Sequence, residues 1–306
     1  MELRHLRYFV AVAEERNFTR AAERLHIAQP PLSRQMQQLE ELLGVALLVR
    51  GSRPLELTEA GQFFYGHAVQ LLAQGAEVVS MTRRIGKIER KFSIGFVGST
   101  LFGFLPEVVR RFKAAHPTTE VMLHEMTTME QIKGLKEGLI DVGIGRIRHE
   151  DPNIRRILLR EEALIAALPM GHTLTGVERG LYLRDLVSDR LIVFPRSPRP
   201  SFADQVLAAF HDRGLAPADT LEVRELQVAL GLVAAGMGVT IVPKSVLGLK
   251  RSDVCYMKMD EPNLSSPIIF SIRALDRSED IKSMLELIYC LYRSEGVPHT
   301  QEVLGY

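Results

Sequence analysis

Near residue 92 the sequence changes its period, and this change limits the possible folds more than any other feature. Short apolar runs typical of strands alternate from there with segments of helical spacing. The predicted strands are FSIGFV at 92–97, VMLHEM at 121–126 and DVGIG at 141–145, separated by helices over 101–115 and 129–138. Strands and helices in this order require a parallel sheet with right-handed crossovers, so the predicted fold class is α/β.

A second unit of the same kind follows the first. Its predicted strands are ALIAALP at 163–169, LIVF at 191–194, EVREL at 222–226 and VTIVP at 239–243, with one helix over 202–213 and another that ends at 235. The strand PIIFSIRAL at 267–275 and a helix over 279–293 are expected to return to the first unit. Two such units joined by crossing strands leave a cleft, and small ligands bind at the carboxyl ends of such strands.

The residues before 92 have a helical pattern instead. A helix is predicted over 4–15, then a short helix with Thr19 as its N-cap, then a third helix that begins at Pro30-Pro31. Proline suits the first turn of a helix, where its missing N–H costs nothing. Apolar residues in the third helix recur at spacings of four and three, which predicts a core-facing stripe formed by Leu32, Met36, Leu39 and Leu43.

The opposite face of the third helix is polar and rich in Arg and Gln. A short helix, a tight turn and a helix of this composition form a helix-turn-helix, whose second helix lies in the major groove of DNA. Arg and Gln reach guanine and adenine edges in bidentate fashion, and Ser and helix N-termini suit phosphate. The predicted DNA contacts are Gln29, Pro30, Pro31, Ser33, Arg34 and Gln37. The alternative is the solvated face of a small helical bundle.

A basic turn and a long helix follow. Apolar residues at 47–49 and 55–57 flank Arg50-Gly51-Ser52-Arg53-Pro54, which predicts a winged element with Arg50 and Arg53 on the sugar-phosphate backbone. Thr58-Glu59 caps the next helix. Its apolar seam repeats at spacings of four and three, which predicts pairing with a second copy of the chain through Phe64, Ala68, Leu71, Gly75, Val78, Thr82 and Ile85.

Composition argues against a membrane span, a metal site and a cofactor. The most apolar stretch, 226–243, is broken by glycines and falls short of the ~18–20 residues that a span needs. The N-terminus lacks the pattern of a secretory signal, so we expect a cytoplasmic protein. Cys255 and Cys290 have no neighbouring His and predict buried thiols. Residues 1–91 carry 13 Lys and Arg against 10 Asp and Glu, which only weakly favours a nucleic-acid partner.

From Leu6 to Gly61 the sequence LRYFVAVAEERNFTRAAERLHIAQPPLSRQMQQLEELLGVALLVR…LTEAG resembles the winged helix-turn-helix of LysR-type transcriptional regulators almost position for position. The stretches IGFVGSTLFGFLP, FPRSPRPSF and RELQVALGLVAAGMGV are similar to the BenM/CatM branch, which controls benzoate and catechol breakdown. The resemblance implies an effector domain of two Rossmann-like subdomains, as in type II periplasmic binding proteins. The expected domains are 1–58 for DNA binding, 59–88 for a linker helix and 89–306 for the effector, divided into 89–161 with 267–306 and 162–266.

Hydroxyl side chains at predicted helix starts suggest an anion site in the cleft. Hydroxyls and free N–H groups at helix N-termini bind carboxylates, although any one Ser or Thr could be a simple helix cap. The predicted effector-binding residues are Ser99, Thr100, Thr127, Thr128, Arg146, Ser201 and Phe202. The resemblance implies that three of them, Ser99, Thr128 and Phe202, lie against a carboxylate such as cis,cis-muconate.

The resemblance also implies a second, apolar-walled pocket for an aromatic acid such as benzoate. Its residues match Arg160, Glu225 and Tyr292. Arg160 could equally pair with Glu161 or Glu162 at the surface.

These patterns favour a DNA-binding regulator that responds to a small acid. A regulator of another pathway with a different anion is an alternative, and so is a solute-binding protein, although the missing signal and the helix-turn-helix argue against the latter. An enzyme is not expected, because the chain has no Walker loop or G-x-S-x-G motif and its His residues share no spacing. The resemblance implies an activator that binds double-stranded promoter DNA as a homodimer or homotetramer and acts on RNA polymerase.

Overall fold

Two units make up the computed structural model, which describes residues 1–49, 51–52, 54–85, 91–249 and 251–302. The side chains of residues 77 and 80–85 lie outside that description. The N-terminal unit comprises Met1–Glu89 with Lys136–Gly138, and the C-terminal unit comprises Arg90–Leu135 with Leu139–Tyr306. Each unit is described by itself.

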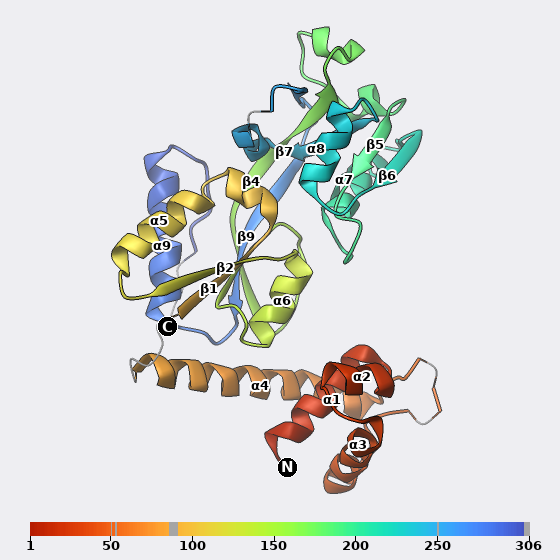
Figure 1. The fold of residues 1–306 in the computed structure, drawn as a ribbon, viewed down its shortest axis with the longest axis vertical. Coiled ribbons are helices and arrows are strands. Elements are labelled where there is room, and N and C mark those ends of the chain that lie inside the picture. The colour runs from red at the N-terminus through yellow and green to blue at the C-terminus, as the bar shows by residue number, and fades with distance from the viewer. Residues whose placement is uncertain (50, 53, 86–90, 250, 303–306) are drawn as a thin grey trace. The chain divides into compact units, whose positions relative to one another are not determined.

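The N-terminal unit is built from helices around a small apolar core. Its elements are α1 (Leu3–Glu15), α2 (Phe18–Arg24), α3 (Gln29–Leu43) and α4 (Glu59–Ile85), shown in red to orange in Figure 1. Leu6 and Phe9 of α1 pack with Leu32 and Met36 of α3, and alanines of α2 let these helices approach closely. The stripe predicted for α3 is confirmed except for Leu43, which is 38% exposed at the end of the helix.

The helix starts of this unit differ in how they are capped. Asn17, not Thr19, is the N-cap of α2, so the predicted cap is wrong by two residues: the Asn17 side chain accepts from the amide of Thr19 at 2.8 Å and from that of Arg20 at 3.2 Å. The N-cap of α3 is Ala28, which has no capping side chain. Pro30 and Pro31 explain this, because they remove two of the N–H groups that a cap would bind.

The wing is present as a short antiparallel bridge. Leu48 pairs with Leu57, and the amide of Val49 donates to the carbonyl of Glu56 at 2.9 Å. Arg50 and Arg53 lie outside the described residues, so their predicted role stays a prediction. Thr58 caps α4 as predicted, since its hydroxyl accepts from the amide of Gly61 at 3.0 Å.

Helix α4 carries exposed apolar residues beyond the winged core. Ala68 is buried and Phe64 is half-buried in that core, whereas Leu71 and Val78 are exposed in the single chain, Val78 to 62%. The side chains of Thr82 and Ile85 are not described. An exposed apolar seam is consistent with pairing between two α4 helices, which remains a prediction.

The C-terminal unit contains two α/β lobes, which confirms the predicted fold class. The first lobe contains β1 (Lys91–Phe96), β2 (Glu120–Glu125) and β3 (Val142–Gly145), with α5 (Leu105–Ala115), α6 (Thr128–Lys136) and α9 (Glu279–Ser294). The second contains β5 (Arg190–Val193), β6 (Asp219–Glu222) and β7 (Val239–Pro243), with α7 (Phe202–His211) and α8 (Leu226–Ala234). The strand triples β2-β1-β3 and β6-β5-β7 are parallel, as predicted.

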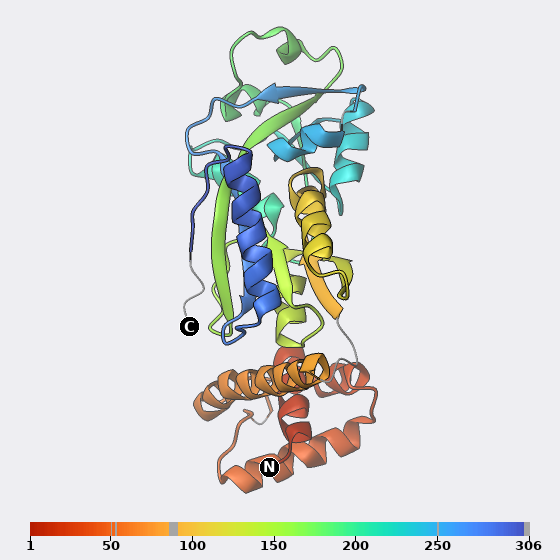
Figure 2. The same cartoon turned by 90° about the vertical axis from the view of Figure 1, so that its left-hand side faces the viewer.

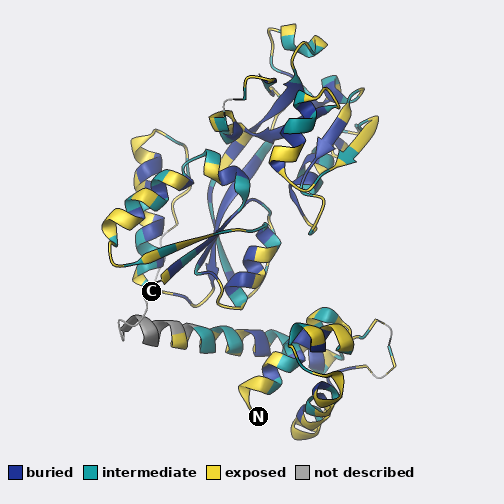
Figure 3. Ribbon diagram, viewed as in Figure 1, coloured by how far each residue is buried: buried dark blue, intermediate teal, exposed yellow. Residues whose placement is uncertain are grey.

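Two long antiparallel strands join the lobes. β4 (Ile154–Pro169) and β9 (Ser265–Arg273) run from one lobe to the other, giving the order β2-β1-β3-β9-β4-β7-β5-β6, with β8 (Val254–Lys258) paired to β4. Helices α5 and α9 lie next to each other in the first lobe (Figure 2). In Figure 3 the central strands are buried, while the edge strands β2 and β6 are largely exposed.

Several predicted boundaries are wrong in this unit. The helix predicted from residue 101 is a 3₁₀ turn, Gly98–Phe102, followed by α5, because the chain breaks the helical conformation at Gly103. The strand predicted at 222–226 ends at Glu222, and Glu225 is the N-cap of α8. Strand β8 and the first half of β4 were not predicted, because neither has a clear apolar period.

Candidate effector cleft and DNA-contact surface

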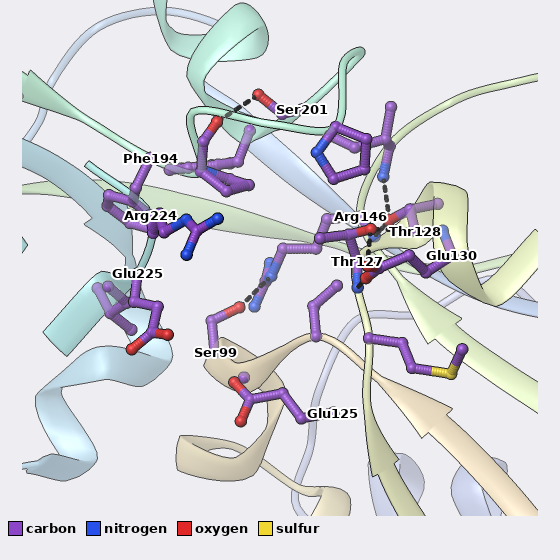
Figure 4. Close-up of a pocket in the computed structure, with 18 of the residues that line it drawn as sticks. Ser99, Glu125, Thr127, Thr128, Glu130, Arg146, Phe194, Ser201, Arg224 and Glu225 are labelled. Carbon is purple, nitrogen blue, oxygen red and sulfur yellow. Dashed lines mark hydrogen bonds between the residues drawn. The ribbon is translucent and has the colours of Figure 1, made fainter. Parts of the chain in front are cut away.

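A cavity of about 540 Å³ lies in the C-terminal unit at the strand ends of the two lobes. Its walls come from residues that follow β1, β2, β3 and β5 and from the first residues of α6, α7 and α8. Of the seven predicted effector-binding residues, six line it: Ser99, Thr127, Thr128, Arg146, Ser201 and Phe202. Figure 4 shows side chains from both lobes facing this space.

Arg146 is tied into a buried network. It is 3% exposed, its Nε donates to the Ser99 hydroxyl at 2.8 Å, and its Nη2 donates to Glu162 Oε2 at 2.5 Å (Figure 4 shows the Ser99 bond). Glu162 Oε1 accepts from the amide of Ser245 at 2.7 Å. Arg146 is therefore not an isolated positive charge, because the Glu162 carboxylate pairs with it.

The pKa values follow from this burial. Burial lowers the pKa of Arg146, and the Glu162 carboxylate offsets part of that change. Burial alone would raise the pKa of Glu162, but the guanidinium groups of Arg146 and Arg160 hold it below its ordinary value. The Glu162 carboxylate is therefore ionised near neutral pH, and two arginines face it.

The hydroxyls of Thr127 and Thr128 at the start of α6 form different hydrogen bonds. The Thr127 hydroxyl donates to Glu130 Oε2 at 2.8 Å, as an N-cap paired with an acidic residue in the first turn. The Thr128 hydroxyl, 3% exposed, accepts from the amide of Arg146 at 3.1 Å. Because a hydroxyl also carries one donor hydrogen, Thr128 can donate to a ligand while it accepts from the backbone.

The start of α7 supplies the opposite wall. Ser201 is buried, its hydroxyl donates to the carbonyl of Pro195 at 3.0 Å and its amide donates to Asp204 Oδ2 at 2.7 Å. Its hydroxyl hydrogen is therefore used by the fold, and Ser201 stands at the N-cap of α7, where it forms a capping box with Asp204. The Phe202 ring packs against Phe194 at 5.4 Å between ring centres and gives this wall an apolar surface.

The cavity also contains charged residues that were not predicted as ligands of the first site. Glu125, Glu130, Arg224 and Glu225 line it, and of these Glu130 is held by Thr127. The backbone dipoles at the starts of α6, α7 and α8 add positive potential for an anion.

A second, much smaller cavity of about 20 Å³ lies beside the first. Arg160 lies over the rings of Phe104 and Tyr292, 5.6 Å from each centre, and burial raises the pKa of Tyr292. Thr100 lines this second cavity and not the first, and its hydroxyl donates to the carbonyl of Val97 at 2.7 Å.

The predicted grouping of Glu225 with Arg160 and Tyr292 is corrected by the structure. Glu225 lines the large cavity, and the carboxylate beside Arg160 is Glu162, whose Oε2 lies 3.7 Å from Arg160 Nη2. The pairing of Arg160 with Glu162 considered from the sequence is therefore present, but in the interior. Glu161 is on the other side of β4 and pairs with Arg148. The spacing of two residues along one strand was the available signal, since it puts residues 160 and 162 on one face.

The exposed face of α3 is the candidate DNA-contact surface. Gln29, Pro30, Pro31, Arg34 and Gln37 are exposed, and Ser33 is half-buried. The Gln29 side chain donates to the Ser33 hydroxyl at 2.9 Å. Arg34 and Gln37 make no hydrogen bond or ion pair with any residue that the structure describes, so both side chains can meet an external partner.

Two absences hold for the described part of the chain. Its helices include none that is both long and apolar enough to cross a membrane. Over the same residues there is no group of His, Cys, Asp and Glu that could hold a metal ion.

Comparison with known proteins agrees with both parts of this description. Residues 3–62 match the model of the bacterial regulatory helix-turn-helix protein, lysR family, and residues 86–290 match the LysR substrate binding domain. The chain is 48% identical to the HTH-type transcriptional regulator BenM of Acinetobacter baylyi, over 97% of this chain and 98% of that protein. It is 47% identical to the probable cat1 operon transcriptional activator of Acinetobacter lwoffii, over 95% of this chain and 96% of that protein.

Two solved structures are similar as well. The BenM effector binding domain with its effector benzoate is 40% identical, with a TM-score of 0.67 over 71% of this chain and 98% of that one. Full-length CbnR complexed with its target DNA is 34% identical, with a TM-score of 0.60 over 95% of this chain and 99% of that one.

Proposed function

The chain belongs to the LysR family of bacterial transcriptional regulators, and from this premise we propose that a small carboxylate in the large cavity controls its action on promoter DNA. The observation that carries the proposal is the meeting of three helix starts, from α6, α7 and α8, around one cavity of about 540 Å³. Helix starts attract anions, and a cavity of this size suits a small organic acid.

The effector is a carboxylate derived from aromatic-compound breakdown, such as cis,cis-muconate or benzoate. Thr128 and Ser99 supply the polar contacts, Phe202 supplies an apolar face, and the start of α7 completes the site. BenM, which binds benzoate in one of its structures, supports this class of effector. The regulated genes would then belong to aromatic-acid catabolism.

A second aromatic-acid site at Arg160 and Tyr292 requires the side chains there to rearrange. A cavity of about 20 Å³ holds roughly one water molecule, so benzoate would have to displace packed side chains there. Arg160 between two aromatic rings supplies a cation for a carboxylate, and Glu162 supplies the competing negative charge.

On the DNA side, the face of α3 reads base edges and the wing contacts the backbone. Gln29, Ser33, Arg34 and Gln37 lie on that face, and the expected backbone contacts are Arg50 and Arg53. A homodimer formed through α4 would place two such helices on a palindromic site, and two dimers would form the tetramer. The protein would act in the cytoplasm as an activator that works with RNA polymerase, with no catalytic role. A solute-binding role is not retained, because a helix-turn-helix precedes the ligand-binding unit.

Binding would act by favouring one conformation over another. An acid that contacts α6 of one lobe and α7 of the other stabilises the arrangement in which both contacts are made. Only a difference in affinity between two states can shift their populations. The expected consequence is a changed arrangement of the assembly on DNA.

The test is a titration of the full-length protein with cis,cis-muconate and with benzoate. Thermal unfolding and calorimetry should show one of these acids stabilising the protein, by about 2.7 kcal/mol at 100 times its Kd. A gel shift with a promoter fragment should show preference over random DNA. If neither acid nor a related dicarboxylate stabilises the protein, the effector class is wrong; if no promoter fragment is preferred, the DNA role of α3 is wrong.

A further inference from the structure

Gln131 is a fully buried polar side chain one helical turn after Thr128 in α6. It is 0% exposed, although glutamine is mostly found at protein surfaces. Its Nε2 donates to the carbonyl of Met126 at 2.9 Å and to that of Ile144 at 3.2 Å. Met126 directly follows β2 and Ile144 lies in β3, and these strands flank β1. One side chain therefore ties α6 to two strands at their carboxyl ends.

Three glycines make room for this side chain. Gly95 of β1 and Gly143 of β3 are partners in register, and Gly145 lies two residues further on the same face. A Cβ at position 143 would lie 2.9 Å from Gln131 Oε1, and one at position 95 would lie 3.1 Å from Gln131 Cγ. A Cβ at position 145 would lie 2.7 Å from the Thr128 hydroxyl oxygen. The flat glycine surface thus lets α6 sit close enough for Gln131 to reach both carbonyls.

Gln131 and Thr128 both form hydrogen bonds with the backbone at the end of β3. The Thr128 hydroxyl accepts a hydrogen bond from the amide of Arg146. The carbonyl of Ile144, two residues earlier in the chain, accepts a hydrogen bond from Gln131. The two side chains, three residues apart, therefore fix the first turn of α6 against the end of β3. Thr127 and Thr128 line the large cavity from this turn.

We propose that Gln131, seated on Gly95, Gly143 and Gly145, is a positioning residue that sets the effector affinity of the cleft by holding the start of α6 in place. It does not line the cavity and acts through Thr127 and Thr128. The proposal rests on the proposed effector site. It extends that site to a buried residue and a glycine surface behind it.

A glutamine with a purely structural role would affect the melting temperature of the protein and not its affinity for the effector. Gln131 Oε1 is buried with no hydrogen-bond partner among the described residues, so Gln131→Met removes an unsatisfied acceptor together with two hydrogen bonds. Loss of the two hydrogen bonds lowers the free energy of unfolding, and loss of the unsatisfied acceptor raises it. The melting temperature should therefore change little, whereas loss of positioning should appear in ligand affinity.

The experiment compares full-length variants by calorimetry with cis,cis-muconate as the probe. Gln131→Met is expected to weaken muconate binding by about tenfold, because the start of α6 would be held less firmly and would have to be ordered when the ligand binds. Thr240→Val is the matched control, because it removes a buried bond of 2.7 Å from the Thr240 hydroxyl to the carbonyl of Ile192 in the second lobe. The control should bind muconate within about twofold of the unchanged protein, even where its melting temperature is lower.

Comparison with Thr128→Val separates failure of this inference from failure of the site. If Thr128→Val loses affinity and Gln131→Met does not, Gln131 has no positioning role and the site stands. If neither variant changes muconate binding, the proposed site is wrong.

Hydrogen exchange gives a measurement that needs neither ligand nor site. In Gln131→Met, exchange should become faster in a peptide covering 126–136 and stay unchanged in peptides of the second lobe. Gly143→Ala, which meets the same side chain from the sheet, should give the same local effect. Unchanged exchange in both variants would overturn the proposal.

Discussion

Helix α3 and the effector cleft contain similar polar side chains in opposite states. Arg34 on α3 is exposed and its side chain makes no hydrogen bond or ion pair with any described residue, whereas Arg146 in the cleft is 3% exposed and bound to Ser99 and Glu162. A free arginine keeps its hydrogen bonds for an external partner, and a paired one gives a fixed shape. The exposed face of α3 is thus available to an external partner, whereas the polar groups of the cleft are largely organised among themselves.

The largest expected effect comes from breaking the buried network of the cleft. Glu162→Ala leaves Arg146 and Arg160 without their carboxylate in the interior. Removing one partner of a buried ion pair costs about 3–5 kcal/mol, so thermal or urea unfolding of the C-terminal unit should shift strongly. Glu161→Ala is the control: Glu161, the residue next to Glu162, pairs with Arg148 at the surface, and its loss should cost less than about 1 kcal/mol. Equal effects would mean that burial does not distinguish the two pairs.

The same carboxylate gives an acid dependence. Arg146 and Arg160 hold the pKa of Glu162 below its ordinary value of 4.5, so the stabilisation is present above that pH and is lost as the pH falls through the lower folded value. The difference in melting temperature between the unchanged protein and Glu162→Gln should therefore shrink on acidification below pH 4.5. A difference that grows at low pH would contradict the assignment.

A smaller effect is expected from the exposed arginine of α3. Arg34→Ala should cost about 1–3 kcal/mol of operator binding in a gel shift and relax base preference, because one bidentate contact is lost. Stability and muconate affinity should not change. Arg110→Ala, which removes another exposed arginine from α5, should leave operator affinity unaffected. If both variants bind the operator alike, Arg34 does not read bases.

The smallest effects concern the helix starts of the N-terminal unit. Asn17→Ala removes the cap of α2 and should cost about 1 kcal/mol of stability. Ala28→Ser adds a capping side chain to α3, yet the second and third residues of that helix are Pro30 and Pro31, which have no N–H to donate. Chemical denaturation should therefore show no gain for Ala28→Ser. A clear gain would mean that α3 does not begin as described.

Much of the architecture could be predicted because it depends on local period. The alternation of strand and helix after residue 92 identified the lobes, and the stripe of Leu32, Met36 and Leu39 identified the buried side of α3. Boundaries were less accurate where a single residue decides them. Thr19 and Asn17 are both good caps, and only the path of the chain selected Asn17.

The location of the cleft could be predicted from the sequence, whereas most of its buried hydrogen bonds and ion pairs could not. Residues at strand ends gave six of the residues that line the cavity. Glu162 and Gln131 gave no comparable signal, because each lies inside an element and acts on a residue distant in the sequence. Glu225, which the family resemblance grouped with Arg160 and Tyr292, lines the large cavity instead.

The sequence alone determined the class of fold, the helix-turn-helix and the family, because these follow from periods and motifs that are local to the chain. Only the tertiary structure decided which charges are paired and which are free. Pairing depends on distances between elements far apart in sequence, and burial sets how strongly each pair interacts. Arg34 and Arg146 are the same type of residue in the sequence. In the fold, Arg34 is exposed and available to DNA, whereas Arg146 is paired with Glu162 in the cleft.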